Sequence, residues 1–119
     1  MREIKFRADD GMDWIYSSAV DYRGEFEQWC IFDFEDEQWL YCGEPQQYTG
    51  LIDIKGNQIY HTDLIKDDEN FIWEVIYKQG AFYAKCDDLM AEQLLSSVNL
   101  FGVVVGNTYE HPELLGDSK

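Results

Sequence analysis

Four closely spaced carboxylates, Asp33, Glu35, Asp36 and Glu37, are the residues whose types and spacing first suggest chemistry. Clustered carboxylate oxygens are ligands that hard cations such as Ca²⁺ prefer. An EF-hand loop, however, also needs a glycine at its sixth position and a spaced array of oxygen ligands, and this run has neither. Charge runs of this kind are usually solvated, so we predict a hairpin tip that holds no metal and could contact a protein partner.

A cysteine and a histidine could together supply a nucleophile, because a thiolate needs a nearby base or cation. The candidates are His61, Asp63 two residues later, and Cys86 further on. No spacing signature accompanies them, and His111 lies in a separate segment near the end of the sequence. We therefore interpret His61 as a loop histidine and the three cysteines as packed, reduced thiols. The sequence predicts no catalytic residue, no zinc site and no cofactor.

The glycines do not form a phosphate-binding loop, since neither GxGxxG nor GxxxxGK[ST] occurs. They are better interpreted as residues that give the backbone a sharp turn or a bulge. Structural turns are predicted at Gly50, Gly56, Asp63, Gly80 and Gly106.

The net charge of the 119-residue chain is −15, from 24 acidic residues against nine Lys and Arg. Phosphate binding relies on clustered basic residues, so this balance argues against direct nucleic-acid binding and against an anionic membrane surface. There is no early apolar run with a cleavage site and no apolar stretch near 18 residues. We therefore expect a cytoplasmic protein that is neither exported nor inserted in a membrane.

Residues 9–44 carry much of this charge: eleven acidic residues against the single Arg23. Nine aromatic side chains also run through the segment, enough to bury surface and fold. We predict two strands within it, 26–34 and 38–42, with Phe32 and Phe34 facing inward. The aromatic side chains are expected to pack in the core rather than stack on nucleobases, because stacking also needs a positive groove.

The remaining sequence alternates between short apolar segments and turn residues, which indicates strands. The expected strands are residues 1–8, 12–16, 51–52, 59–60, 64–65, 71–78, 81–85 and 101–109. Leu89–Leu95 has high helix propensity and apolar spacing near 3.6, which predicts one short helix near residues 88–96. The fold class predicted is mainly β, a small barrel or sandwich, as one domain over 1–119 in which residues 9–44 could form an acidic subdomain.

Four sequence blocks together resemble one known family. They are Met1-Arg-Glu-Ile-Lys-Phe-Arg-Ala8, the stretch from Tyr48-Thr-Gly-Leu51 to Lys66, Gly80-Ala-Phe-Tyr83, and Val105-Gly-Asn-Thr-Tyr-Glu-His-Pro-Glu-Leu-Leu115. These blocks are similar to the YopX family, which implies a small protein encoded by phages and prophages, largely β, with a part similar to an SH3-like barrel. The resemblance supplies no established activity and no catalytic residues. Where the family signature usually has an acidic residue and a glycine before the aspartate, this chain has His61-Thr62-Asp63, and residues 9–44 match no family motif.

Three functional hypotheses follow from these observations. The first is a non-enzymatic acidic interaction module that acts on an unknown host or phage protein. In a sharper version it imitates nucleic acid, with carboxylates such as Asp33 and Glu35 about 6.7 Å apart on one strand face. The alternative is a self-assembling scaffold module that pairs through β edges into a homo-oligomer. The third is a small enzyme that uses His61 with Asp63 or Cys86.

Overall fold

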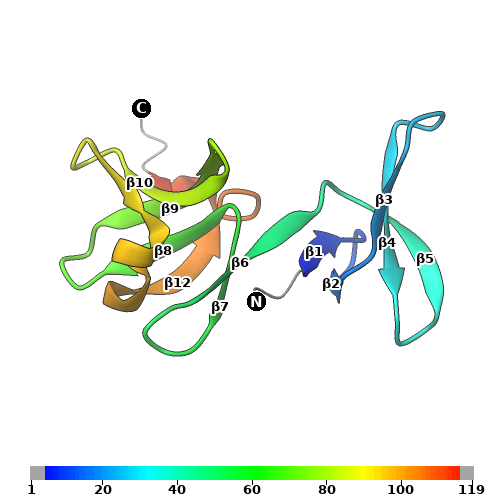
Figure 1. The fold of residues 1–119 in the computed structure, drawn as a ribbon, viewed down its shortest axis with the longest axis horizontal. Coiled ribbons are helices and arrows are strands. Elements are labelled where there is room, and N and C mark those ends of the chain that lie inside the picture. The colour runs from blue at the N-terminus through cyan, green and yellow to red at the C-terminus, as the bar shows by residue number, and fades with distance from the viewer. Residues whose placement is uncertain (1–4, 116–119) are drawn as a thin grey trace. The chain divides into compact units, whose positions relative to one another are not determined.

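The computed structural model describes residues 5–115 and consists mainly of short strands, which confirms the predicted fold class (Figure 1). By its internal contacts the chain divides into two compact units, Met1–Tyr48 and Thr49–Lys119. The first unit contains the acidic segment 9–44, which the sequence suggested as a subdomain of a single domain.

The first unit contains a three-stranded antiparallel sheet in the order β3-β4-β5 and a hairpin of β1 and β2. Strand β6 begins in this unit, where Gln46 and Gln47 pair with β1, and continues into the second unit. The bounds are β1 Phe6–Asp9, β2 Trp14–Ser17, β3 Val20–Arg23, β4 Gln28–Asp33, β5 Gln38–Cys42 and β6 Gln46–Ile52.

The core of the first unit forms on one face of the three-stranded sheet. Ile31 lies opposite Val20 on β3 and Leu40 on β5, so these three side chains share a face. That face packs against Ala8 and Ile15 of the β1–β2 hairpin, and Ile31 and Ala8 are fully buried.

The prediction that Phe32 and Phe34 face inward is wrong. Side chains alternate across a strand, so burial of Ile31 places Phe32 on the opposite face. Phe34 follows the end of β4 and is 59% exposed. Aromatic type favoured the Phe32 face in the sequence, but the aliphatic residues of the neighbouring strands determine which face is covered.

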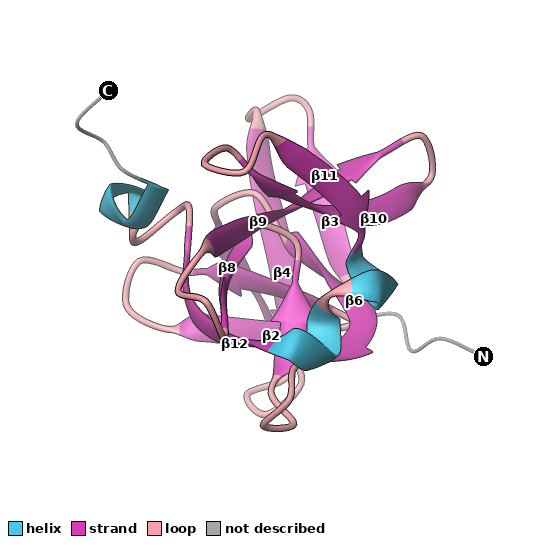
Figure 2. Ribbon diagram, turned by 90° about the vertical axis from the view of Figure 1, so that its left-hand side faces the viewer, coloured by secondary structure: helices cyan, strands magenta, loops and turns pink. Residues whose placement is uncertain are grey.

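The second unit contains a five-stranded antiparallel sheet in the order β11-β10-β9-β8-β12. Two 3-10 turns connect β11 to β12 and are seen in cyan in Figure 2. The described strands do not close into a barrel, because β11 and β12 form the two edges of the sheet. The bounds are β7 Gln58–Tyr60, β8 Asp63–Asp67, β9 Ile72–Lys78, β10 Ala81–Cys86, β11 Ala91–Leu94, η1 Leu95–Ser97, η2 Asn99–Phe101, β12 Gly102–Asn107 and η3 Pro112–Leu115.

The helix predicted near residues 88–96 is present only as the 3-10 turn η1 at its end. Residues 87–90 form a tight turn in which Met90 has a φ of 50° and its N–H donates to the Asp87 carbonyl. Ala91–Leu94 then pair with β10 as strand β11. Hairpin pairing therefore overrides the local helix propensity of this segment.

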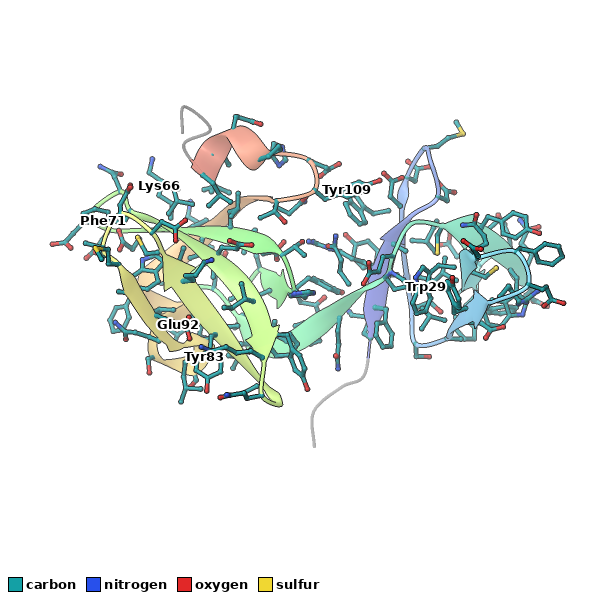
Figure 3. All side chains as sticks on the ribbon, turned by 90° about the horizontal axis from the view of Figure 1, so that it is seen from above. Trp29, Lys66, Phe71, Tyr83, Glu92 and Tyr109 are labelled. Carbon is teal, nitrogen blue, oxygen red and sulfur yellow. The ribbon has the colours of Figure 1, made fainter. Side chains whose placement is uncertain are left out.

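The core of the second unit combines side chains of β8, β9 and β10 with Ile59 of β7 and Leu95 of η1. Its buried members are Ile59, Ile65, Trp73, Val75, Phe82, Ala84, Cys86 and Leu95. On the surface, Lys78 forms an ion pair with Glu92 and lies 5.0 Å from the ring centroid of Tyr83. Figure 3 shows Tyr83 and Glu92 near each other on the neighbouring strands β10 and β11.

Thr62 occupies the corner before β8 with a φ of 77°, which is an unfavourable conformation for a β-branched residue. Two backbone bonds hold it there: its N–H donates to the Val75 carbonyl, and its carbonyl accepts from the Thr108 N–H. Its buried hydroxyl oxygen has no hydrogen-bond partner among the described residues. The backbone of this corner is thus suited to glycine, which is the usual residue at this position in the family signature that the sequence resembles.

We expect Thr62→Gly to stabilise the second unit by about 1 kcal/mol. Relief of the left-handed conformation is worth about 1–3 kcal/mol, and the added flexibility of glycine offsets about 0.5–1 kcal/mol of it. Urea unfolding measures the change in the free energy of unfolding when it is followed at Trp73, the single tryptophan of this unit. Asn70→Gly is the control, because Asn70 also has a positive φ, of 71°, which asparagine tolerates. An equal gain in both variants, or a loss in Thr62→Gly, would contradict strain at Thr62.

Candidate protein-interaction surface

The four predicted carboxylates lie at the β4–β5 connection. Strand β4 ends at Asp33, and residues 34–37 form the turn. The Asp33 carboxylate accepts the backbone N–H of Glu35 at 3.0 Å and that of Asp36 at 3.4 Å. Asp33 therefore shapes its own turn, and Glu35 does not continue a strand. The prediction of a regular carboxylate array on one strand face is wrong, because the strand ends before Glu35.

The outer face of the three-stranded sheet is an aromatic surface, contrary to the core packing that the sequence predicts for these residues. We define the outer aromatic face as Phe32, Phe34, Trp39 and Tyr41. Tyr41 is 64% exposed and Trp39 is 44% exposed, although large aromatic side chains are ordinarily covered. Cross-strand register could have indicated this surface, since Trp39 pairs with Phe32 and therefore shares its face.

The outer aromatic face is an ordered row rather than a set of separate side chains. Phe34 meets Phe32 edge to face at 4.8 Å between ring centroids, and Phe32 meets Trp39 in the same way at 5.3 Å. At the far end the Arg23 guanidinium lies 5.8 Å from the Trp39 ring centroid and is bonded to Asp21 at 2.8 Å. Edge-to-face contacts are favourable between aromatic rings and stabilise this arrangement.

Two hollows adjoin this row, both within the first unit. The first, of about 300 Å³, is lined by Trp14, Ile15, Tyr16, Asp33, Phe34 and Glu35. The second, of about 240 Å³, is lined by Arg23, Cys30, Trp39 and Tyr41. The first hollow has aromatic walls and two carboxylates, whereas the second contains the only basic residue of the acidic segment.

The buried carboxylates of the second unit serve its architecture. Asp53 is 1% exposed and accepts four hydrogen bonds, from the backbone N–H groups of Lys55, Asn57 and Val104 and from the Asn57 side chain. Burial raises the pKa of Asp53, but these bonds, led by that of Val104, more than offset burial, and the pKa lies below its ordinary value of 3.8. The half-buried Asp67 behaves in the same way: burial raises its pKa, and hydrogen bonds led by that of the Trp73 indole N–H bring the pKa below its ordinary value.

Of the predicted turn residues, Gly56 and Gly80 lie in connections, whereas Gly50 lies within β6 and Gly106 within β12. Gly50, Gly56 and Gly80 all have a positive φ, of 88°, 87° and 81°. Gly106 lies at a register shift in β12, where an added Cβ would come within 2.6 Å of the His111 ring. Asp63 is buried at the start of β8, and its carboxylate accepts the Tyr60 N–H at 2.7 Å.

The residues considered for a nucleophilic site lie in different environments. Cys86 is buried in the apolar core, and His61 lies half-buried with its ring centroid 6.4 Å from that of Phe82. All three cysteines are free and buried. Burial raises the pKa of the Cys42 thiol to about 11, so it stays protonated at neutral pH. The Nδ1 atom of His111 accepts the Asn107 N–H at 3.3 Å in the closing turn.

Residues 5–115 contain neither a metal-binding cluster nor a membrane-spanning helix. In this part of the chain no three side chains of His, Cys, Asp or Glu gather in a way that could hold a metal ion. The described helical segments are all single short turns, none of which has the length and apolar character needed to cross a bilayer.

Comparison with known proteins places the chain in a family. The crystal structure of protein EF1440 from Enterococcus faecalis is similar, with a TM-score of 0.55 and 22% sequence identity, over 97% of this chain and 99% of that one. At this identity the likeness concerns the fold alone. No curated protein matches the chain. The family model described as YopX protein matches residues 5–116, nearly the whole sequence. The resemblance seen in the sequence is thereby confirmed, and the chain belongs to the YopX protein family.

Proposed function

We propose that this protein is a non-enzymatic interaction module that binds a basic protein of a bacterial host through its first unit. The observation that carries the proposal is the outer aromatic face, a row of rings in the most acidic part of the chain in which Phe34, Trp39 and Tyr41 are solvent-exposed. Exposed apolar patches with a polar rim are typical of interaction sites, and Tyr, Trp and Phe are enriched there. The phage or prophage origin and cytoplasmic location implied by the family resemblance and the sequence belong to this proposal.

Charge complementarity favours a basic partner. The acidic turn, defined as residues 34–37, adds three carboxylates beside Phe34. A potential of one sign accelerates encounter with the opposite charge and disfavours acidic competitors. Aromatic anchors then supply the short-range contact energy. Imitation of nucleic acid is not part of the proposal, because the regular carboxylate spacing it needs ends with β4.

Self-assembly is a second candidate, favoured by strand β5. This strand is an edge of the three-stranded sheet, contains no lysine or proline, and exposes Trp39 and Tyr41. In natural proteins, lysine or proline residues usually protect an edge strand from pairing with another chain. Light scattering at high micromolar concentration tests this candidate: a dimer or ring would support it, and a monomer would remove it.

Affinity capture from bacterial lysate tests the interaction module. The bait variant Glu35→Gln/Asp36→Asn/Glu37→Gln neutralises the acidic turn but keeps Asp33, whose carboxylate shapes it. We expect capture of a basic protein to fall about tenfold, since each charge contributes up to about 1 kcal/mol at an exposed site. Moderate salt should weaken capture by the native bait.

The matched control removes the same charge from the second unit. Asp68→Asn/Glu69→Gln/Asp88→Asn changes three exposed acidic residues with no hydrogen bond or ion pair from their side chains among the described residues. This variant should capture as much partner as the native bait. If both triple variants lose capture equally, only net charge matters and the proposed surface is wrong. If the native bait captures nothing above a blank resin, the proposed function itself is wrong.

A further inference from the structure

The hollow beside β2 combines apolar walls with negative charge. Trp14, Ile15 and Tyr16 come from β2, and Asp33, Phe34 and Glu35 come from the end of β4 and the acidic turn. Its volume of about 300 Å³ is at the lower end of the range for ligand pockets, enough for one long side chain. No lysine or arginine is among its lining residues.

The chemistry of this lining favours a cation with an apolar stem. Aromatic rings attract cations through their faces, and carboxylates attract the same charge directly. Trp14 already binds one cation, because the Arg7 guanidinium lies 4.9 Å from the centroid of the Trp14 ring. The Nε of Arg7 also donates a hydrogen bond to the Gln46 side chain at 2.8 Å. That cation belongs to the fold, so Phe34 and Glu35 are the residues through which a second cation would be recognised.

The two carboxylates of the hollow are not equivalent. Asp33 uses one oxygen to accept two backbone N–H groups of the turn. The exposed Glu35 side chain makes no hydrogen bond or ion pair with any described residue. Glu35 can therefore pair with an incoming charge without breaking an internal contact, while Asp33 fixes the turn that presents it.

We propose that this hollow receives one lysine or arginine side chain from a basic segment of the partner. The stem packs against Phe34, and the charged end lies at the carboxylate of Glu35. This inference rests on the proposed function in that it names the partner's chemistry at the same surface. It accounts for the position of the exposed Glu35 next to Phe34 at the rim of the hollow.

NMR titration of the ¹⁵N-labelled full chain tests the hollow with defined probes. The probes are the capped peptides Gly-Ser-Arg-Ser-Gly, Gly-Ser-Lys-Ser-Gly and the uncharged norleucine analogue, each added at physiological salt. We expect the arginine or lysine peptide to shift the Trp14 indole N–H and the Phe34 and Glu35 amides in a saturable way. The norleucine peptide should leave these three signals unchanged. Comparison of the arginine and lysine peptides shows which charged group the hollow prefers.

Two variants and two matched controls localise the effect. Phe34→Leu and Glu35→Gln should each weaken peptide binding about threefold, which corresponds to one exposed cation–π contact or ion pair. Phe26→Leu and Glu25→Gln make the same changes in the β3–β4 turn, which is also acidic and carries an exposed phenylalanine. These controls should change binding less than 1.5-fold, a threshold of about 0.2 kcal/mol.

The outcomes separate this inference from the proposed function. Absence of saturable shifts with either basic peptide, or equal weakening by test and control variants, would overturn the hollow as a cation site. If lysate capture depends on the acidic turn but Phe34→Leu binds the basic peptides as well as the native protein does, the interaction module stands and only the proposal for the hollow fails. If the peptides bind but no lysate protein is captured, the hollow stands as a cation site and the proposed function fails.

Discussion

Replacing Ile31 with alanine is expected to destabilise the first unit by about 3 kcal/mol, because Ile-to-Ala changes at buried sites cost about 2–5 kcal/mol. Ile31 is fully buried, and the buried cluster around it is small, consisting of Ala8 and Cys42 with four partly covered neighbours. A core of this size has few side chains that could move to fill the cavity. Loss of the unit would also remove the outer aromatic face, because β4 carries both Ile31 and Phe32.

Fluorine NMR with 5-fluorotryptophan measures this effect unit by unit. Trp14, Trp29 and Trp39 report on the first unit and Trp73 on the second. In urea, the three signals of the first unit should change at lower denaturant in Ile31→Ala, while the Trp73 signal keeps its native midpoint. Ile54→Ala, at a position 62% exposed, makes the same chemical change and should cost less than about 0.5 kcal/mol. If all four signals shift together, the two units unfold as one.

Local turn chemistry made much of the second unit predictable. Gln79-Gly80 between two alternating segments indicated a hairpin, and β9 and β10 form it with Lys78 opposite Ala81. Gly56 between two short apolar segments likewise marks the connection from β6 to β7. In these stretches the residues that need a positive φ and the residues that need burial are close in sequence, so a short window contains the information.

The errors arose where a distant segment decides the outcome. Leu89–Leu95 has the spacing of a helix, but pairing with β10 extends residues 91–94 as a strand. Phe32 is a larger apolar residue than Ile31, yet Ile31 is the buried one because Val20 and Leu40 share its face. Reading β4 alone cannot resolve this choice, since both of its faces are apolar. Register with β3 and β5 was the missing information.

The same error concealed the candidate site. The sequence predicts the aromatic residues of 9–44 in the core, which leaves the acidic residues as the only expected surface feature. With Trp39 and Phe34 exposed, the two features become one surface. Acidic residues alone would have indicated little more than solubility. Beside an ordered row of rings they support the proposal of a partner with positive charge and apolar stems.

Replacing Asp53 with asparagine is expected to destabilise the second unit by about 3 kcal/mol at neutral pH. The carboxylate accepts four hydrogen bonds that link the Lys55–Asn57 turn to β12 through Val104. Hydrogen bonds to a charged group contribute about 1.5–3 kcal/mol each. Asparagine preserves one oxygen but turns an NH₂ group toward donors, so at least one buried donor loses its acceptor. Urea unfolding followed at Trp73 measures the loss, with Asp68→Asn at an exposed position as the control.

The pH dependence of that loss distinguishes the charge of Asp53 from its shape. Because its pKa in the folded protein lies below the ordinary 3.8, its charge contributes stability that is fully present above the unfolded pKa. That contribution is lost as the pH falls through the folded pKa, where Asp53 takes up a proton. The difference in unfolding free energy between the native protein and Asp53→Asn should thus be constant from pH 7 to about 5 and shrink below about 4. Asp67 also has a lowered pKa, but it is present in both proteins and cancels from the difference. A difference that stays constant down to pH 2 would mean that asparagine fails for reasons of shape, and that the negative charge of Asp53 does not hold the turn against β12.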